Sequence, residues 1–420
     1  TRRSSDLLWG IDFFWIAAIG LVVLTALYTI FGGMKSVLYT SVLQTPILLL
    51  GSLIILILGF KELGGWDEMM RVCGAVTVND YGDTMTNLIR SNDDANFPWL
   101  GALIGSAIIG FWYWCTDQFI VQRVLSGKNE MEARRGTIFG AYLKLLPVFL
   151  FLIPGMIAFA LHQKYIGAGG EGFLPMLENG TANADAAFPT LVAKLLPAGV
   201  KGLVVCGILA ALMSSLASLF NSSAMLFTID FYKRFRPQTS EKKLVGIGQV
   251  ATVVIVILGI LWIPIMRSVG DVLYTYLQDV QSVLAPGIAA AFLLGICWKR
   301  TSAQGGMWGL ISGMVIGLTR LGAKVYYSNA GEVADSTFKY LFYDMNWLFF
   351  CGWMFLFCII VVIVVSLATE APTAEKIQGL VFGTATKEQK ASTRASWNHW
   401  DIIHTVIILA ITGAFYWYFW

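Results

Sequence analysis

The chain is poor in charged residues, and this shortage excludes most classes of soluble protein. Only 13% of its 420 residues are charged and 57% are hydrophobic, whereas soluble domains carry about 25% charged residues. The formal net charge of +3 is too small and too dispersed to indicate binding to nucleic acid. With a mean hydropathy of +0.69, the sequence predicts an integral membrane protein.

The sequence also lacks the usual motifs of enzymes. Its six cysteines form no Cys-x-x-Cys pair and no cluster with histidine. Five of them lie in apolar runs and are predicted to be core residues: Cys115, Cys206, Cys297, Cys351 and Cys358. Because no phosphate-binding loop, metal cluster or nucleophile motif is present, we expect no enzymatic activity. The chain has neither a starting methionine nor a cleavable signal, and we expect it to be a piece of a longer protein.

Ten apolar stretches of about 20 residues or more are each long enough to cross a bilayer. They cover residues 8–31, 37–60, 98–122, 136–161, 203–229, 244–266, 271–298, 303–324, 346–368 and 401–420. The sequence therefore predicts a multi-pass protein embedded in the lipid bilayer of the cell membrane, either plasma or inner.

Lysine and arginine gather in four loops that lie on one side of the membrane if these ten spans are right. They are Lys35; Arg123, Lys128, Arg134 and Arg135; Lys233, Arg234, Arg236, Lys242 and Lys243; and Lys299 and Arg300. The positive-inside rule places this side in the cytoplasm. The polar loop 369–399 lies on the same side, whereas loops 61–97 and 162–202 lie outside and are more acidic. A short helix is predicted at Phe188 to Leu196.

One span carries a one-sided stripe of polar residues. No charge occurs between Gly207 and Thr228. At about 100° per residue, six small or polar residues of this run share an arc of roughly 120°: Ala211, Ser214, Ser215, Ser218, Asn221 and Ser222. Neutral oxygens suit a hard cation, and nothing on the stripe titrates near neutral pH to carry a proton. A packing face of small residues is the alternative, and composition leaves both open.

Several spans contain residues that interrupt helices. Span 98–122 has three glycines before the aromatic patch Phe111 to Trp114, and span 271–298 contains Ala285-Pro286-Gly287. Such breaks free backbone carbonyls, which in transporters often line a site at the membrane midplane. An ordinary kink is the alternative.

Charged side chains inside spans need partners. Lys144 lies near the middle of its span, where a lysine costs about 2.5–3.5 kcal/mol on insertion scales, so it should face a cavity or a partner. A structural ion pair with Asp117 or Asp279 is the alternative. Arg320 lies near a span end, and its side chain is expected to reach the membrane surface.

Six short motifs follow one another over nearly the whole chain. They are Gly32-Gly-Met-Lys35, Trp112-Tyr-Trp-Cys-Thr-Asp-Gln-Phe-Ile-Val-Gln-Arg123, Tyr142-Leu-Lys-Leu145, Ala210-Ala-Leu-Met-Ser-Ser-Leu216, Phe227-Thr-Ile-Asp230 and Phe292-Leu-Leu-Gly-Ile-Cys-Trp-Lys-Arg300. In this order they resemble the sodium/solute symporter family, in its sodium/glucose cotransporter branch.

The resemblance implies an all-α polytopic fold, the inverted-repeat bundle of five plus five helices with broken helices. The chain, residues 1–420, would be a single transmembrane domain, with 8–298 in the repeat core and 299–420 forming peripheral helices. Its ten transmembrane helices would be the last ten of fourteen, so the chain would lack the first four.

The resemblance also implies two sites. Ala211 through its carbonyl, with Ser214 and Ser215 through their hydroxyls, matches the family's sodium ligands. The solute site would contain four side chains. Tyr113 and Trp114 would be the aromatic gate and platform, and Lys144 and Gln278 would form hydrogen bonds with the solute.

The implied function is sodium-coupled symport of a hexose or inositol by alternating access. Another solute such as an organic acid, or a sugar-gated sensor with little net transport, remains an alternative. Gly110 stands where this branch usually has a polar pocket residue, so the identity of the solute stays open. Ser41 stands where the family often has aspartate, and we therefore expect one sodium ion per solute.

Overall fold

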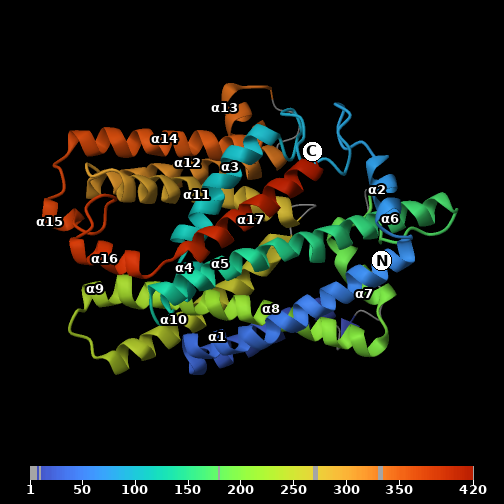
Figure 1. Cartoon of the computed structure of the whole chain (residues 1–420), viewed down its shortest axis with the longest axis horizontal. Coiled ribbons are helices and arrows are strands. Elements are labelled where there is room, and N and C mark those ends of the chain that lie inside the picture. The colour runs from blue at the N-terminus through green and yellow to red at the C-terminus, as the bar shows by residue number, and fades with distance from the viewer. Residues whose placement is uncertain (1–6, 9–10, 178–179, 268–272, 330–333, 420) are drawn as a thin grey trace. The chain divides into compact units, whose positions relative to one another are not determined.

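The computed structural model describes residues 7–8, 11–177, 180–267, 273–329 and 334–419 (Figure 1). Most of the described residues are helical, and the rest form loops and a two-stranded antiparallel ribbon of β1 (Leu7–Leu8) and β2 (Ile11–Asp12). The chain forms two compact units, Thr1–Cys73 with Leu146–Asp271, and Gly74–Leu145 with Val272–Trp420. The family resemblance predicted another division, into a repeat core at 8–298 and peripheral helices at 299–420. That division stays a prediction.

The first unit consists mainly of long helices. After the ribbon it contains α1 (Phe13–Leu63), most of α2 (Trp66–Gly74), η3 (Val148–Leu152), α6 (Ile153–Gly167), η4 (Ala184–Ala186), α7 (Ala187–Leu195), α8 (Ala198–Met225), η5 (Leu226–Tyr232), α9 (Lys233–Phe235) and α10 (Glu241–Arg267). Helix α7 confirms the short helix predicted at Phe188 to Leu196.

Helix α1 is continuous for 51 residues. The predicted boundary between spans 8–31 and 37–60, with a loop at Lys35, is therefore wrong. Two adjacent glycines lie at 32 and 33 between the predicted spans, but a glycine inside a helix costs only about 1 kcal/mol and keeps its backbone N–H donor. The prediction that the other three basic loops share one side of the membrane does not depend on this boundary and stays a prediction.

Close approach holds α1 against α8. A Cβ added to Gly51 would lie 2.7 Å from a methyl of Val204, and one added to Gly207 would lie 3.0 Å from a methyl of Ile47. Membrane helices associate mainly through such van der Waals packing, which small residues permit. The contact fixes the polar stripe of α8 against α1.

The second unit contains the remaining helices. They are α3 (Trp99–Phe111), η2 (Trp112–Thr116), α4 (Gln118–Leu125), most of α5 (Glu130–Pro147), α11 (Leu273–Cys297), α12 (Ala303–Asn329), α13 (Thr337–Lys339), η6 (Tyr340–Asp344), α14 (Trp347–Ala368), α15 (Ala374–Ile377), α16 (Lys387–Ala395) and α17 (His399–Tyr418).

Helices α11, α12 and α14 pack as one group, seen together in Figure 1. Glycines recur at every fourth position of α12. A Cβ on Gly313 would lie 3.0 Å from the Cα of Gly287 on α11, and one on Gly317 would collide with the carbonyl of Val283. Gly309 instead faces a side-chain methyl of Val362 on α14. The axes of α11 and α12 can therefore approach until their backbones touch.

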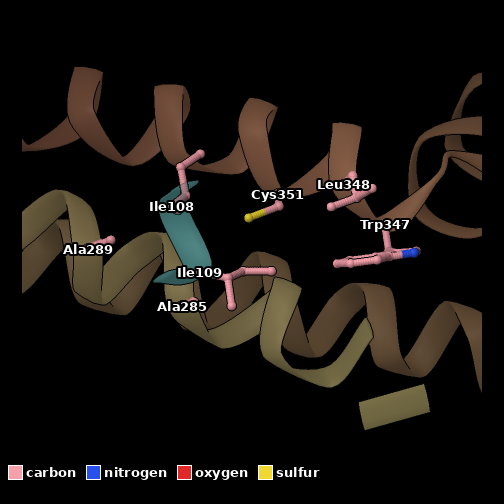
Figure 2. Packing of buried hydrophobic residues seen from close by; sticks show 7 residues of the cluster. All are labelled: Ile108, Ile109, Ala285, Ala289, Trp347, Leu348 and Cys351. Atoms are coloured by element: carbon pink, nitrogen blue, oxygen red, sulfur yellow. The ribbon is translucent and has the colours of Figure 1, made fainter. Parts of the chain in front are cut away.

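Helix α3 completes this core. Ile108 and Ile109 lie between Cys351 of α14 and Ala285 of α11 (Figure 2), and all four side chains are buried. Burial of an isoleucine side chain stabilises a fold by about 1.5–3 kcal/mol in water; within a bilayer the gain comes from packing density instead. Pro286, expected to interrupt its span, lies inside the continuous α11.

Among the described residues, eight helical segments are long and apolar enough to cross a membrane. They are Gln44–Leu63, Trp99–Thr116, Glu130–Gly167, Ala198–Phe235, Glu241–Pro264, Leu277–Cys297, Trp347–Ala368 and His399–Tyr418. The predicted span 303–324 is helical as part of α12, but α12 is more polar than these segments. Span 8–31 corresponds to the shorter apolar stretch Phe14–Ile30.

The cysteine prediction is right for two residues and wrong for three. Cys351 and Cys358 are buried, whereas Cys115, Cys206 and Cys297 are exposed on helix surfaces. A thiol is apolar enough to face lipid as well as a core. An apolar run therefore does not distinguish the two positions.

Candidate functional site

The predicted sodium ligands lie on α8, where it packs against α1. Ser214 is buried, Ala211 is half-buried and Ser215 is exposed. The Oγ of Ser214 lies 2.5 Å from the Oγ of Ser41 on α1. A hydroxyl that shares one hydrogen with its partner keeps lone pairs for another contact. The two helices therefore bring neutral oxygens together next to the predicted ligands.

The polar stripe of α8 is not uniform. Ser218 Oγ donates to the carbonyl of Ser214 at 3.1 Å, and Ser222 Oγ donates to the carbonyl of Leu219 at 3.1 Å. Both serines are buried. Hydrogen bonds of a hydroxyl to its own helix are typical of a packing face. The packing alternative thus fits Ser218 and Ser222, while Ser214 reaches across to the neighbouring helix.

The aromatic patch of span 98–122 forms a π-helical turn, η2. The wider turn ends at Asp117, whose backbone is extended (φ −74°, ψ 121°) and whose carboxylate accepts the N–H of Phe119 at 3.1 Å as the cap of α4. The predicted break in this span is therefore confirmed, and it falls directly after the aromatic residues. Single π-helical turns of this kind occur frequently at functional sites.

Within η2 the rings of Tyr113 and Trp114 meet edge to face, with centroids 5.2 Å apart. The Nζ of Lys144 lies 5.5 Å from the centroid of the Trp114 ring, within range of a cation–π contact. Tyr113 is half-buried, and Trp114 and Lys144 are exposed. The structure thus brings three of the four predicted solute residues together.

Gln278 lies on α11, which packs against η2. Its Nε2 donates to the hydroxyl of Tyr274 one turn earlier, at 3.2 Å. That bond orients the amide from within α11. A neutral amide that both donates and accepts can serve two hydroxyls of a solute.

A charged cluster joins α11 and α12 next to Gln278. The carboxylate of Asp279 lies 2.5 Å from Lys324 Nζ and 3.5 Å from a guanidinium nitrogen of Arg320. Arg320 also donates to the carbonyl of Met345 at 2.8 Å and stacks over the ring of Phe350 at 4.1 Å.

This cluster corrects two expectations. The side chain of Arg320 does not reach the membrane surface, because the residue is fully buried. In the described part of the chain Asp117 caps α4 and Asp279 pairs with α12, so neither forms the ion pair considered for Lys144. Opposite charges inside two consecutive spans are the signal in the sequence that could have identified this cluster.

Sequence reasoning assigned no role to the histidines, yet two are hydrogen-bonded. The Nδ1 of buried His162 accepts the N–H of Leu174 at 3.0 Å, which ties the loop after α6 to that helix. The Nδ1 of His404 lies 3.0 Å from the hydroxyl of Tyr142. Partners this far apart in sequence leave no local pattern.

Comparison with known proteins identifies relatives of the chain. Residues 6–313 match the model of the sodium:solute symporter family. The chain is 35% identical to the sodium/mannose cotransporter SLC5A10 of Bos taurus over 454 residues, covering 100% of this chain and 75% of that protein. It is 36% identical to the sodium/myo-inositol cotransporter 2 of Homo sapiens, covering 88% of this chain and 56% of that protein. Sodium/glucose cotransporter 4 of Mus musculus is 35% identical, with 91% and 59% covered.

A solved structure shares the fold. It is a Na+-coupled sialic acid symporter in a substrate-bound outward-open state, with a TM-score of 0.63 and 21% sequence identity over 87% of this chain and 68% of that one. This likeness confirms the predicted all-α transporter bundle. The chain spans little more than half the length of the inositol and glucose cotransporters. On the family match and the relative covered over 75% of its length, the chain belongs to the sodium:solute symporter family, as its motifs predicted.

Proposed function

We propose that the protein is a multi-pass membrane transporter that couples the uptake of a small polar solute, a hexose or an inositol, to sodium. The three relatives described above are named as cotransporters of sodium with mannose, myo-inositol or glucose. These three solutes are neutral and rich in hydroxyls. The observation that carries the proposal is the grouping of Tyr113, Trp114 and Lys144 in one unit.

Each of these side chains has chemistry that suits such a solute. An indole ring offers a flat apolar surface to the C–H face of a sugar, and Trp114 is exposed enough to do so. The contact with Trp114 holds the ammonium of Lys144 beside the ring, where it can donate to a hydroxyl at the rim of the solute. Gln278 would add an amide donor and acceptor from α11.

Sodium would bind at the carbonyl of Ala211 and the hydroxyls of Ser214 and Ser215. Sodium is a hard cation that prefers oxygen ligands, and neutral oxygens exchange it readily enough for transport. The packing of α8 against α1 fixes the position of Ser214. Binding of the ion would favour the outward-open state, and the inward sodium gradient would then drive the solute across the membrane.

The chain covers only part of its relatives, and the family resemblance implies that further ligands come from helices outside residues 1–420. We therefore propose that residues 1–420 alone do not transport, and that the longer parent protein does. Robust sodium-driven uptake by vesicles that contain only residues 1–420 would contradict this.

Radiotracer uptake by the parent protein in proteoliposomes tests the function. We expect accumulation of labelled glucose, mannose or myo-inositol under an inward sodium gradient and none when potassium replaces sodium. Accumulation of an organic acid instead of these solutes would change the proposed substrate class to organic acids. Solute-evoked current without accumulation would instead identify a sensor.

A further inference from the structure

The polar segment between α14 and α17 contains a turn at 377–384 with a defined shape. Its centre is Thr384, whose Oγ1 lies 2.8 Å from the carbonyl oxygen of Ile377 and 2.7 Å from that of Val381. The N–H of Gly379 also bonds to Thr384, and Gly379 takes a left-handed conformation with φ of +76°. These bonds hold the side chains of the turn in fixed directions.

Two large apolar side chains project from this turn. Leu380 is 73% exposed and Phe382 is 82% exposed, whereas Val381 between them is only 7% exposed. Val381 therefore anchors the turn, and its two neighbours point away from the protein. A rigid turn that holds two apolar side chains out in water forgoes the favourable burial of their surface.

Backbone contacts place the turn at the end of a membrane span. The N–H of Phe382 donates to the carbonyl of Ile296 at 2.7 Å, and Ile296 is the penultimate residue of α11, whose apolar part is Leu277–Cys297. Arg300 donates to the carbonyl of Thr369 at 2.7 Å and so fixes the start of the same segment. The tip of the turn thus lies at the depth where α11 leaves the bilayer.

Helix α16, which follows the turn, has one basic face. Lys387, Lys390 and Arg394 fall within an arc of about 60° at 100° per residue, and Glu388 lies outside that arc. All four are exposed. Basic residues beside a bilayer attract anionic lipid headgroups on the cytoplasmic side.

Tryptophans mark the far end of the segment. Trp397, two residues before α17, and Trp400 in its first turn are exposed, and α17 is itself apolar enough to span the membrane. Tryptophan is enriched at the boundary between hydrocarbon and headgroups. The segment is therefore attached at interface depth at both ends.

We propose that this segment is a lipid-binding surface. Leu380 and Phe382 insert into the cytoplasmic leaflet, and the basic face of α16 binds the headgroups of anionic phospholipids. The surface is built from residues outside the predicted sodium and solute sites, so the inference does not depend on the proposed transport activity.

Site-directed spin labelling of the chain in vesicles tests the insertion. The exposed Cys115, Cys206 and Cys297 are replaced by alanine, and single cysteines are introduced as Leu380→Cys, Phe382→Cys or, as the control, Glu388→Cys. The vesicles contain phosphatidylcholine with about 30% phosphatidylglycerol by design, in line with an anionic leaflet. Labels at 380 and 382 should lose access to a water-soluble nickel chelate and stay accessible to oxygen, whereas the label at 388 should stay accessible to the chelate.

Two outcomes would overturn the insertion. Access of the nickel chelate to position 382 equal to that at 388 would place the turn in water. Exclusion of both reagents would mean that protein covers it. Correct folding is checked in each variant by the lack of maleimide reaction at the buried Cys73, Cys351 and Cys358.

A second comparison tests the basic face. The triple variant Lys387→Gln, Lys390→Gln, Arg394→Gln is compared with the unsubstituted chain. In vesicles with phosphatidylglycerol the label at 382 should lie less deep in the variant, and in pure phosphatidylcholine its depth should be the same in both. Equal depth of the unsubstituted chain in both lipid mixtures would overturn the role of anionic headgroups.

Discussion

The hydroxyls of Ser41 and Ser214 lie 2.5 Å apart, although 173 positions separate the two residues in the sequence. Ser41 comes from α1 and Ser214 from the polar stripe of α8. The pair links the departure from the family motif at Ser41 to the predicted sodium ligand at Ser214. Both partners are neutral, so the pair supplies oxygens without fixed charge.

From this pair we predict a stoichiometry of one sodium ion per solute in the parent protein. A second monovalent cation in a site of low dielectric needs a carboxylate or a nearly full shell of oxygens. Ser41, Ser214 and Ser218 supply three neutral oxygens. The reversal potential of solute-coupled current, measured while the sodium gradient varies, gives the ratio directly. A slope that requires two sodium ions would refute the prediction.

The same pair suggests a variant that gains function. Ser41→Asp would place a carboxylate beside Ser214, and we expect it to raise the apparent affinity for sodium. Ser41→Ala serves as the control, because it removes the hydroxyl and adds no charge. An unchanged sodium dependence in Ser41→Asp would show that the pair lies outside the ion path.

We predict that Ser215→Ala in the parent protein lowers sodium affinity and leaves folding intact. Ser215 is exposed on α8, so its loss creates no cavity. A polar group that interacts with a charge contributes about 1.5–3 kcal/mol, equivalent to about a tenfold to hundredfold change in affinity. The sodium dependence of uptake measures the effect. Ser223→Ala is the matched control, since Ser223 points away from the stripe, and an equal loss in both variants would argue against ligation.

Gln278→Ala should weaken solute binding and preserve sodium binding. The amide can form two hydrogen bonds with solute hydroxyls, each worth about 0.5–1.5 kcal/mol net, so the affinity should fall by about threefold to a hundredfold. Competition for uptake by unlabelled solute measures it. Tyr274→Phe removes only the partner that orients Gln278 and should have a smaller effect. The assignment fails if Gln278→Ala binds the solute as the wild type does.

The charged cluster predicts unequal effects on stability. Asp279→Asn would leave fully buried Arg320 without its carboxylate, and breaking a buried ion pair from one side costs about 3–5 kcal/mol. Lys324→Met should cost less, because the Lys324 side chain is 32% exposed and Asp279 would keep Arg320. Thermal unfolding in detergent compares the two. Greater destabilisation by Lys324→Met would contradict this order.

Acid should open the loop between α2 and α3. Hydrogen bonds from the Asn79 amide (2.7 Å) and from the N–H of Ser91 hold the pKa of Asp83 below its usual value of 3.8. Burial alone would raise the pKa of Asp94, but hydrogen bonds that include the N–H of Phe97 lower it overall. Both carboxylates have a lower pKa folded than unfolded, so their stabilisation is complete above about pH 4 and is lost as the pH falls through the folded values.

Amide hydrogen exchange, corrected for the intrinsic effect of pH, measures this opening. Protection of the Ser91 and Phe97 amides should fall as the pH drops below 4. Asn79→Ala removes a donor to both carboxylates, so the loss should begin at higher pH, whereas Asp80→Asn at an exposed position should leave the onset in place. Constant protection between pH 5 and pH 3 would contradict the prediction.

Sequence reasoning predicted much of the fold because hydrophobic length and helical period are local properties. Spans such as 346–368 and the broken aromatic turn before Asp117 followed from the residues themselves. The turn at Lys35 failed, because glycine permits a turn without requiring one. The prediction that the Arg320 side chain reaches the membrane surface failed because burial depends on partners from other helices. Those partners lie 21 to 41 positions away in the sequence.

The candidate site likewise includes residues that the sequence could predict and contacts that it could not. The residues of the aromatic patch are neighbours in sequence, so Tyr113 and Trp114 were predictable from one motif. The contact of Ser41 with Ser214 was not, because it depends on how α1 and α8 pack. The division of the serine stripe between packing and ion binding likewise depends on which hydroxyls bond to their own helix, and residue type does not reveal that.

The glycines that bring α12 against α11 and α14 have a mechanical consequence. Where two backbones touch, no side chain lies between them that could change rotamer and absorb a displacement. Between Gly287 and Gly313, no side chain is therefore available to take up a change in the distance between α11 and α12. A displacement of α12 toward α11 would therefore act directly on the backbone of the helix that carries Gln278.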